Sequence, residues 1–280
     1  MSAATPLGGF RPQFAEIERV RLRCFDAGSG PPILLVHGLG GAAANWTLLA
    51  SLLAERHRVL VPDLPGHGGS GPPPRGADLG AFADLLATLL EREEAAPAVV
   101  AGHSMGGVVA MHLASHNPSV VSSLALFGTA GIKSLTRSAA VFLTMSGLFR
   151  PARKAARFRE HIACSPRLRR LVFGYWGADD PGAMSEEAVL GWLEAAGDAT
   201  DTATAARALL RDDPRFDLDR VACRALVVWG ARDRLVPVED GFEFARRLRA
   251  PIRVVPGASH LVIGERPDEC AAILERFVAG

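Results

Sequence analysis

Short, uninterrupted apolar runs alternate with amphipathic stretches along most of this chain, and this alternation constrains the fold more than any other feature. Bounded by Gly, Pro or Asp, the runs predict strands at 33–38, 58–63, 98–103, 122–128, 225–230 and 252–257. Strands that are apolar throughout are typical of a parallel sheet with helices on both faces. The sequence therefore predicts an α/β fold with a mostly parallel sheet.

The stretches between these runs place apolar residues three and four positions apart, which is the spacing of a buried helix face. This spacing predicts helices at 45–56, 77–92, 104–116, 238–249 and 265–279. Residues 16–27 alternate more regularly between apolar and polar side chains, which favours an antiparallel hairpin at the sheet edge. With the hairpin, the predicted sheet has eight strands.

The alternation of strands and helices stops between Thr129 and about Cys223, where turns separate what are expected to be several helices. A chain of 280 residues is long for one domain and short for two, so one domain with an insertion fits best. We predict a core domain of residues 1–128 and 224–280, with residues 129–223 inserted as a helical cap, or lid.

Charge and composition disfavour several classes of protein. A formal net charge of +1 gives no electrostatic case for nucleic-acid binding. The first residues, MSAATPLGGFRPQF, do not resemble a secretory signal, and no run of about 18 apolar residues could span a bilayer. The four cysteines lack C-x-x-C spacing, which disfavours a zinc site or a disulfide framework. We expect a cytoplasmic protein without stable membrane insertion; the sequence indicates no oligomeric state.

The segment VAGHSMGG (100–107) places Ser104 two positions from a glycine on either side. A strand is expected before Ser104 and a helix after it, which is the context of a nucleophile elbow. Gly102 and Gly106 would permit the close backbone approach that such a turn requires. The alternative interpretation is a glycine-rich turn between strand and helix that has no chemical role.

A serine nucleophile needs a base, and an acid must orient that base. His260 is the histidine, of eight, that follows the last predicted strand, and Asp233 follows the strand at 225–230. The segment after 122–128 contains no carboxylate, which leaves Asp233 as the candidate acid. The alternatives are an unrelated exposed histidine and an aspartate that caps a helix or forms an ion pair.

The segment HGLGG (37–41) follows ILLV, the apolar part of the predicted strand, and leaves backbone N–H groups free to bind an anion. We predict that the N–H groups of Leu39 and Met105 form an oxyanion hole, which would stabilise a tetrahedral intermediate. His37 and Gly38 belong to this supporting loop, and His37 is expected to hold it by hydrogen bonds rather than to take part in catalysis.

Five segments occur in a characteristic order: HGLGG, DLPGHGGS (63–70), GHSMGG (102–107), WGARDRLVP and GASHLVIGERP. Together they resemble the α/β-hydrolase superfamily. The resemblance implies the α/β-hydrolase fold and a Ser-His-Asp hydrolase with a lid. The chain looks most like carboxylesterases, monoglyceride-type lipases and hydrolases that cleave carbon–carbon bonds.

The residues at the nucleophile elbow disfavour some members of this superfamily. Relatives that alkylate a carboxylate, the haloalkane dehalogenases and epoxide hydrolases, carry Asp where this chain has Ser104, so both are disfavoured. Ring-fission hydrolases that cleave carbon–carbon bonds typically have Asn before the serine, whereas this chain has His103, which weakens that interpretation.

Large apolar side chains in the predicted cap favour a largely apolar substrate pocket. The candidate pocket residues are Phe142, Met145, Phe149 and Trp176. Charges in the cap are segregated, because residues 150–170 are rich in Arg while residues 171–206 contain Asp and Glu but no Lys or Arg. The basic half could receive an acidic substrate or an acyl carrier protein, or the two halves could pair with each other.

The sequence therefore predicts hydrolysis of a carboxylic ester or related acyl compound through an acyl-enzyme on Ser104. The expected partner is a small-molecule substrate, and the mechanism requires no metal and no organic cofactor. Two alternatives stay open. One is a carbon–carbon bond hydrolase, lyase or cyclase that uses the same three residues, and the other is a receptor-like protein that binds a ligand under the cap.

Overall fold

The computed structural model describes residues 10–131, 151–174, 177–198 and 200–280. Within these residues eight strands form one sheet in the order β1-β2-β4-β3-β5-β6-β7-β8. Its strands are β1 (Arg11–Ile17), β2 (Val20–Ala27), β3 (Pro32–Val36), β4 (Arg58–Pro62), β5 (Ala98–His103), β6 (Val121–Phe127), β7 (Arg224–Gly230) and β8 (Ile252–Val255). Strands β3 to β8 pair in parallel, and β2 joins them antiparallel to β4. The predicted mostly parallel eight-stranded sheet is confirmed.

The antiparallel hairpin of β1 and β2 forms the sheet edge, as predicted, but it begins earlier in the chain than the sequence indicates. Its turn is formed by Glu18 and Arg19, whose φ angles of 48° and 66° suit a two-residue hairpin turn. Strand β1 starts at Arg11, five residues before the predicted start at Glu16. Because most of β1 is exposed, its residues carry little of the apolar signal that reveals a strand.

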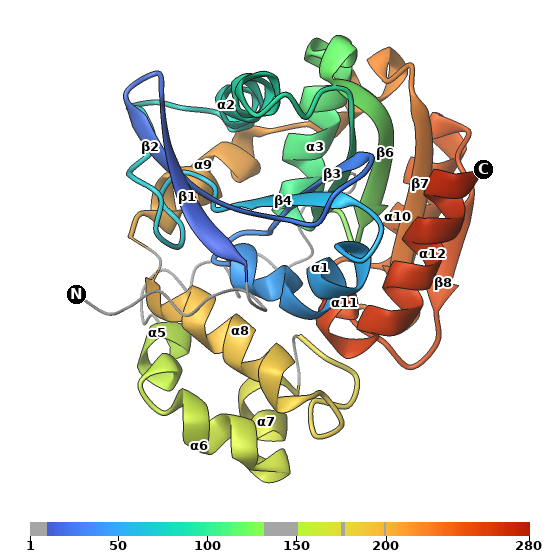
Figure 1. Ribbon diagram of the computed structural model, residues 1–280. Helices are drawn as coiled ribbons and strands as arrows, with labels where there is room; N and C mark the ends of the chain where they lie inside the picture. Colours follow the sequence, from blue (N-terminus) through green and yellow to red (C-terminus); the bar gives the residue numbers. More distant parts are fainter. Residues whose placement is uncertain (1–9, 132–150, 175–176, 199) are drawn as a thin grey trace.

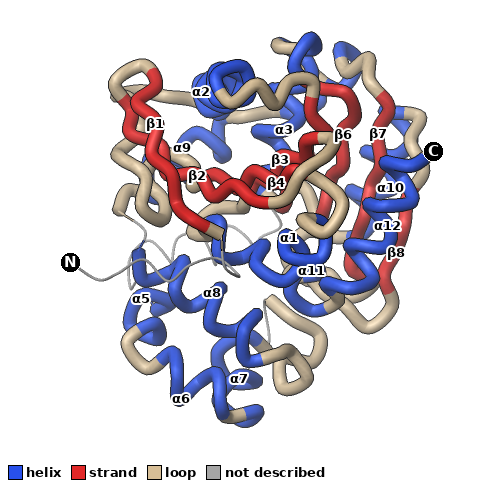
Figure 2. Tube along the Cα trace, viewed as in Figure 1, coloured by secondary structure: helices blue, strands red, loops and turns tan. Residues whose placement is uncertain are grey.

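Helices cover both faces of the sheet (Figures 1 and 2). One face packs against α2 (Leu79–Arg92), α3 (Met105–His116) and α10 (Val238–Leu248). The other packs against α1 (Thr47–Leu53), α11 (Val262–Glu265) and α12 (Pro267–Ala279). Alternate residues of β3 supply the two cores, with Leu34 facing the first group and Leu35 the second. Two short 3₁₀ helices, η1 (Ala43–Trp46) and η2 (Pro118–Val120), precede α1 and β6.

Between β6 and β7 the described chain is helical. The elements are α5 (Pro151–Ala156), α6 (Arg159–Cys164), α7 (Pro166–Phe173), α8 (Glu186–Asp198), α9 (Thr202–Arg211), η3 (Pro214–Phe216) and η4 (Leu218–Arg220). Helices α5 to α8 gather at the bottom of Figure 1, with a small core of their own that includes Ile162, Met184 and Val189.

Helix α9 packs differently, because Ala205 and Ala208 belong to the core shared with α2 and α3. The helical segment therefore has one part with its own core and one part that packs on the sheet domain. Division of the chain into a core and a cap at residues 128 and 223 stays a prediction. Among the described segments, no helix combines the length and apolar character needed to cross a bilayer.

Candidate active site

Ser104 occupies a sharp turn between β5 and α3. Its φ of 54° and ψ of −119° are uncommon for a residue with a side chain, so the turn is strained. Neighbouring backbone holds it there, since the Ser104 N–H donates to the Phe127 carbonyl at 2.9 Å. The Ser104 carbonyl accepts from the N–H groups of Gly107 and Ala130. This turn places the hydroxyl at the N-terminus of α3, where the helix dipole favours negative charge.

The glycines around Ser104 permit close packing of α3 on the sheet. A Cβ atom at Gly102 would lie 2.2 Å from the Gly106 carbonyl oxygen, and one at Gly106 would lie 2.3 Å from the Val36 carbonyl oxygen. Both obstacles are backbone atoms, which cannot move aside without shifting a strand or a helix. The close approach expected from the sequence is therefore present at both positions.

The structure brings Ser104, His260 and Asp233 together. His260 Nε2 lies 3.1 Å from Ser104 Oγ, and His260 Nδ1 lies 2.9 Å from Asp233 Oδ2. The second carboxylate oxygen, Oδ1, accepts the N–H groups of Leu235 and Val236, which fixes the carboxylate. His260 and Asp233 are only 4% and 9% exposed. In this geometry the imidazole can take the hydroxyl proton while the carboxylate orients the ring.

His37 holds the HGLGG loop that follows β3. Its Nδ1 donates to the Gly38 carbonyl at 2.8 Å, and its Nε2 accepts the Leu64 N–H at 2.9 Å. Burial, followed by the neighbouring His67, lowers the pKa of His37 well below its ordinary value. The ring is therefore neutral, as its acceptor role at Nε2 requires.

The HGLGG loop lies directly against the turn that carries Ser104, since a Cβ atom at Gly38 would be 3.0 Å from Ser104 Cβ. Leu39 follows in this loop, and Met105 is the first residue of α3. Within the described part of the chain, neither backbone N–H donates to another protein group. Both donors are available to an anion, and the oxyanion hole they would form stays a prediction.

Asp63, in the DLPGHGGS segment, joins this loop to the rest of the site, a role that the sequence alone did not indicate. Its buried carboxylate accepts the N–H groups of Ala43 at 2.8 Å and Gly69 at 2.9 Å, and pairs with Arg23 Nε at 2.5 Å. These charge-assisted bonds tie the residues after HGLGG to the loop after β4.

Two further residues that sequence reasoning missed support the His260 loop. His103 Nε2 donates to the His260 carbonyl at 2.8 Å, and burial, with the charge of His260, lowers the pKa of His103 to about 3. Glu265 accepts the Ser259 N–H at 2.8 Å, and burial raises its pKa to about 7. His103 directly precedes Ser104, and Glu265 follows His260 in the segment GASHLVIGERP. The type of a residue does not reveal which backbone group it binds.

The helical segment between β6 and β7 contacts the same loop. The Leu261 N–H donates to the Gly177 carbonyl at 2.9 Å, and the Asp179 N–H donates to Glu265 at 2.6 Å. Arg232, next to Asp233, pairs with the Asp179 carboxylate at 2.9 Å. The segment around residue 178 is therefore tied to the loops that carry the candidate acid and base.

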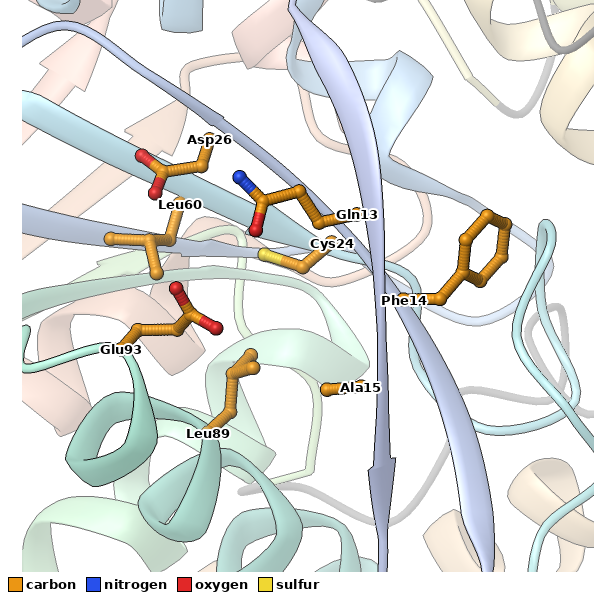
Figure 3. A pocket seen from close by; sticks show the side chains of 8 residues that line it. All are labelled: Gln13, Phe14, Ala15, Cys24, Asp26, Leu60, Leu89 and Glu93. Atoms are coloured by element: carbon orange, nitrogen blue, oxygen red, sulfur yellow. The ribbon is translucent and has the colours of Figure 1, made fainter.

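The side chains predicted to line a substrate pocket, Phe142, Met145, Phe149 and Trp176, all lie outside the described residues. A small pocket elsewhere lies between β1, β2 and the end of α2 (Figure 3). Its two carboxylates, Asp26 and Glu93, pair with Arg58 at 2.6 and 3.3 Å. Burial also raises the pKa of the Cys24 thiol, so this pocket offers no reactive group.

Residues 33–273 match the alpha/beta hydrolase family, a range that includes Ser104, Asp233 and His260. The chain belongs to this family. The fold and family expected from the sequence are thus confirmed, and esterases are among its relatives.

Two curated relatives of this alpha/beta hydrolase are similar over most of its length. A pimeloyl-[acyl-carrier protein] methyl ester esterase from Aromatoleum aromaticum is 32% identical over 274 residues, which cover 89% of this chain and 99% of the relative. The dihydrolipoyllysine-residue acetyltransferase component of the acetoin cleaving system from Pseudomonas putida is 32% identical over 269 residues, 93% of this chain and 67% of the relative.

Among solved structures, a bromoperoxidase from Bacillus anthracis superposes with a TM-score of 0.80 at 22% identity. The superposition covers 96% of this chain and 100% of the bromoperoxidase chain. At this level of identity the likeness shows a shared fold.

Proposed function

We propose that this alpha/beta hydrolase cleaves a carboxylic ester or a related acyl compound through an acyl-enzyme on Ser104. The observation that carries the proposal is the chain of contacts from Asp233 through His260 to Ser104, at 2.9 and 3.1 Å. The methyl ester esterase relative, with 32% identity, supports the ester class.

Each step can be assigned to a group at this site. Asp233 accepts a hydrogen bond from the Nδ1–H of His260, which leaves Nε2 unprotonated and able to take the proton of Ser104 Oγ as the oxygen attacks the ester carbonyl. The N–H groups of Leu39 and Met105 would bind the oxyanion of the tetrahedral intermediate. His260 then protonates the leaving alcohol, and the acyl group remains on Ser104.

Hydrolysis of the acyl-enzyme repeats the sequence with water as the nucleophile. His260 takes a proton from the water as its oxygen attacks the acyl carbonyl, and it returns that proton to Ser104 Oγ as the carboxylic acid leaves.

An ester series tests the proposal. Wild type, Ser104→Ala and the matched control Ser51→Ala are assayed with p-nitrophenyl esters from acetate to laurate, with intact mass measured after a fluorophosphonate probe. Among the described residues, the Ser51 hydroxyl donates to the Thr47 carbonyl of its own helix and to no other group, so its loss should leave catalysis intact. We expect turnover and one adduct in wild type and Ser51→Ala, with kcat lower by about 10⁴-fold or more and no adduct in Ser104→Ala.

Other outcomes identify the alternatives. An adduct on Ser104 without turnover of any ester would indicate an activated serine with a different substrate, as in carbon–carbon bond cleavage. Absence of both adduct and turnover in folded wild type would overturn the proposal and favour a ligand-binding protein.

Exposed cations on the helical segment support a more specific proposal for the substrate. The side chains of Arg153, Lys154, Arg157, Arg159 and Arg167, on or beside α5 to α7, are exposed. None of the ion pairs among the described residues includes them, whereas Arg169 and Arg170 pair with Glu186 and Asp180 of the acidic half. We propose that the unpaired cations receive an anionic extension of the acyl substrate, since the methyl ester esterase relative acts on a carrier-linked group.

Charge reversal tests this substrate preference. We expect Arg157→Glu combined with Arg159→Glu to raise KM about tenfold for an ester attached to an acidic carrier protein, because opposite charges would become like charges. The KM for p-nitrophenyl acetate should not change. Arg215→Glu is the control, because Arg215, in η3, is also exposed but pairs with Asp213. An equal change in KM for the carrier-linked ester in Arg215→Glu and in the double variant would contradict the preference for an anionic substrate. It would leave the proposal of ester hydrolysis unaffected.

A further inference from the structure

Two histidines one turn apart on α3, His112 and His116, face a carboxylate from the segment that leads into β7. His112 Nδ1 lies 3.2 Å from Asp217 Oδ2, and His116 Nε2 lies 3.0 Å from Asp217 Oδ1. All the ligand atoms lie within 4.8 Å of one another. In a tetrahedral zinc site with bonds of 2.0–2.1 Å, neighbouring ligand atoms are about 3.3 Å apart. The two histidine–carboxylate distances are therefore close to that spacing, although they involve different oxygens of Asp217, and no pair of ligand atoms is more than 4.8 Å apart.

His112 has the surroundings of a metal-binding imidazole. It is only 8% exposed, and its Nε2 lies 2.6 Å from Asp212 Oδ2, so Nε2 carries the proton. Its Nδ1, in contrast, has no hydrogen-bond partner among the described residues, although it lies close to Asp217. Histidine ligands commonly donate their second N–H to a carboxylate, which orients the ring and increases its basicity. Asp212 stands in that position, and the unpartnered nitrogen stands in the position of the ligand atom.

We propose that His112, His116 and Asp217 bind one divalent transition-metal ion, with Zn²⁺ as the representative case, and that Asp212 orients His112. Two imidazoles and a carboxylate are the donor types that such ions prefer, and water would complete the coordination. Helix α3 carries Ser104 at its start and this cluster near its end. The ion would join the end of α3 to the segment between α9 and β7, which is a structural role.

Three charged side chains from neighbouring segments lie near the cluster. Arg220 Nη1 lies 3.5 Å from His116 Nε2 and 3.6 Å from Asp217 Oδ1, and Asp212 and Asp78 add negative charge. The Arg220 side chain is 65% exposed, so it can turn into solvent when an ion binds. The competing state is a metal-free network in which Arg220 and a proton on His112 balance the carboxylates.

Zinc titration of the 280-residue chain distinguishes these states. The protein is treated with a chelator, dialysed and titrated with Zn²⁺ by calorimetry, with stoichiometry read from native mass spectrometry. We expect one bound ion, affinity at least about 100-fold weaker in His116→Ala and Asp217→Asn, and about 10- to 100-fold weaker in Asp212→Asn. Arg220→Ser should bind the ion more tightly than wild type, because it removes a positive charge beside the ligands.

Two histidine variants control for other zinc ligands. His161→Ala removes an exposed histidine of α6, and His260→Ala removes the histidine at Ser104; neither should change the affinity. Zinc should also raise the Tm of wild type but not of His116→Ala, whose side chain is 39% exposed and so dispensable for folding. Binding that survives in both His116→Ala and Asp217→Asn, or that is lost in His161→Ala or His260→Ala, would overturn the proposal.

Discussion

Two histidine–aspartate pairs lie at opposite ends of helix α3, and they differ in the group that the second ring nitrogen faces. His260 and Asp233 are 2.9 Å apart, and His112 and Asp212 are 2.6 Å apart. All four side chains are no more than 10% exposed. The second nitrogen of His260 faces a hydroxyl, that of Ser104, whereas the second nitrogen of His112 faces a carboxylate, that of Asp217.

The difference shows that a buried histidine–aspartate pair does not itself define a function. A hydroxyl has a proton to give, so an imidazole that faces it can act as a general base. A carboxylate at neutral pH has none, so an imidazole that faces it either binds a proton of its own or shares a cation with the carboxylate. The group that faces the second ring nitrogen of the histidine therefore separates a candidate catalytic site from a candidate binding site.

Replacement of each aspartate by asparagine should separate the two pairs by the largest margin. In Asp233→Asn we expect kcat to fall by about 10⁴-fold, because an amide stabilises the wrong tautomer of the base. In Asp212→Asn we expect kcat for the same p-nitrophenyl ester to stay within about threefold, since that pair does not contact Ser104. Unfolding curves for both variants would check that each is folded. Similar losses of kcat would refute the distinction.

Much of the candidate catalytic site, at the start of α3, could be predicted from the sequence because its residues follow parallel strands. Ser104, Asp233 and His260 come after β5, β7 and β8, whose carboxyl ends meet along one edge of the sheet. Strand order alone thus brings together Ser104 and His260, which are 156 positions apart in the chain. Strand β1 was placed too late because it is mostly exposed and has no continuous apolar run.

The other end of α3 could not be predicted in the same way. His112 and Asp212 are 100 positions apart, and their contact depends on the path of the chain from α9 to β7, for which no strand sets the direction. A signal was nevertheless present, since His112 and His116 are four positions apart in a predicted helix, a spacing that puts both on one face. The cysteine spacing that disfavours a zinc site carries no information about this histidine pair.

Removal of His112 should reduce stability rather than activity. In His112→Asn we expect the free energy of unfolding to fall by about 2–4 kcal/mol without added metal. The buried carboxylates of Asp212 and Asp217 would then lose the protonated imidazole that lies between them. The kcat should stay within about twofold of wild type. Urea unfolding and ester turnover, measured on one preparation, test both parts. A large fall in kcat without a change in stability would mean that this end of α3 contributes to catalysis.

Glu265, beside the candidate catalytic site, should give the fold a pH-dependent stability. Burial raises its pKa from 4.5 to about 7, so the folded protein holds the proton more tightly than the unfolded chain. The resulting stabilisation is fully present below pH 4.5 and is lost as the pH rises to about 7. It amounts to at most about 3 kcal/mol. Glu265→Gln should flatten the dependence of unfolding free energy on pH in this window, while Ser51→Ala, which removes no titratable group, should leave that slope unchanged.

The smallest effect is expected at His103, which positions the candidate base through its backbone. In His103→Phe the ring contact with Trp192 can persist, but the His260 carbonyl loses the donor that now lies 2.8 Å away. A buried acceptor without its donor costs about 1 kcal/mol or more, so kcat should fall about fivefold with KM unchanged. With its pKa near 3, His103 is already neutral at assay pH, and the pH profile of kcat/KM should keep its shape. His116→Phe, at the opposite end of α3, should change none of these quantities; an equal loss of kcat there would show that the two ends are coupled through the helix.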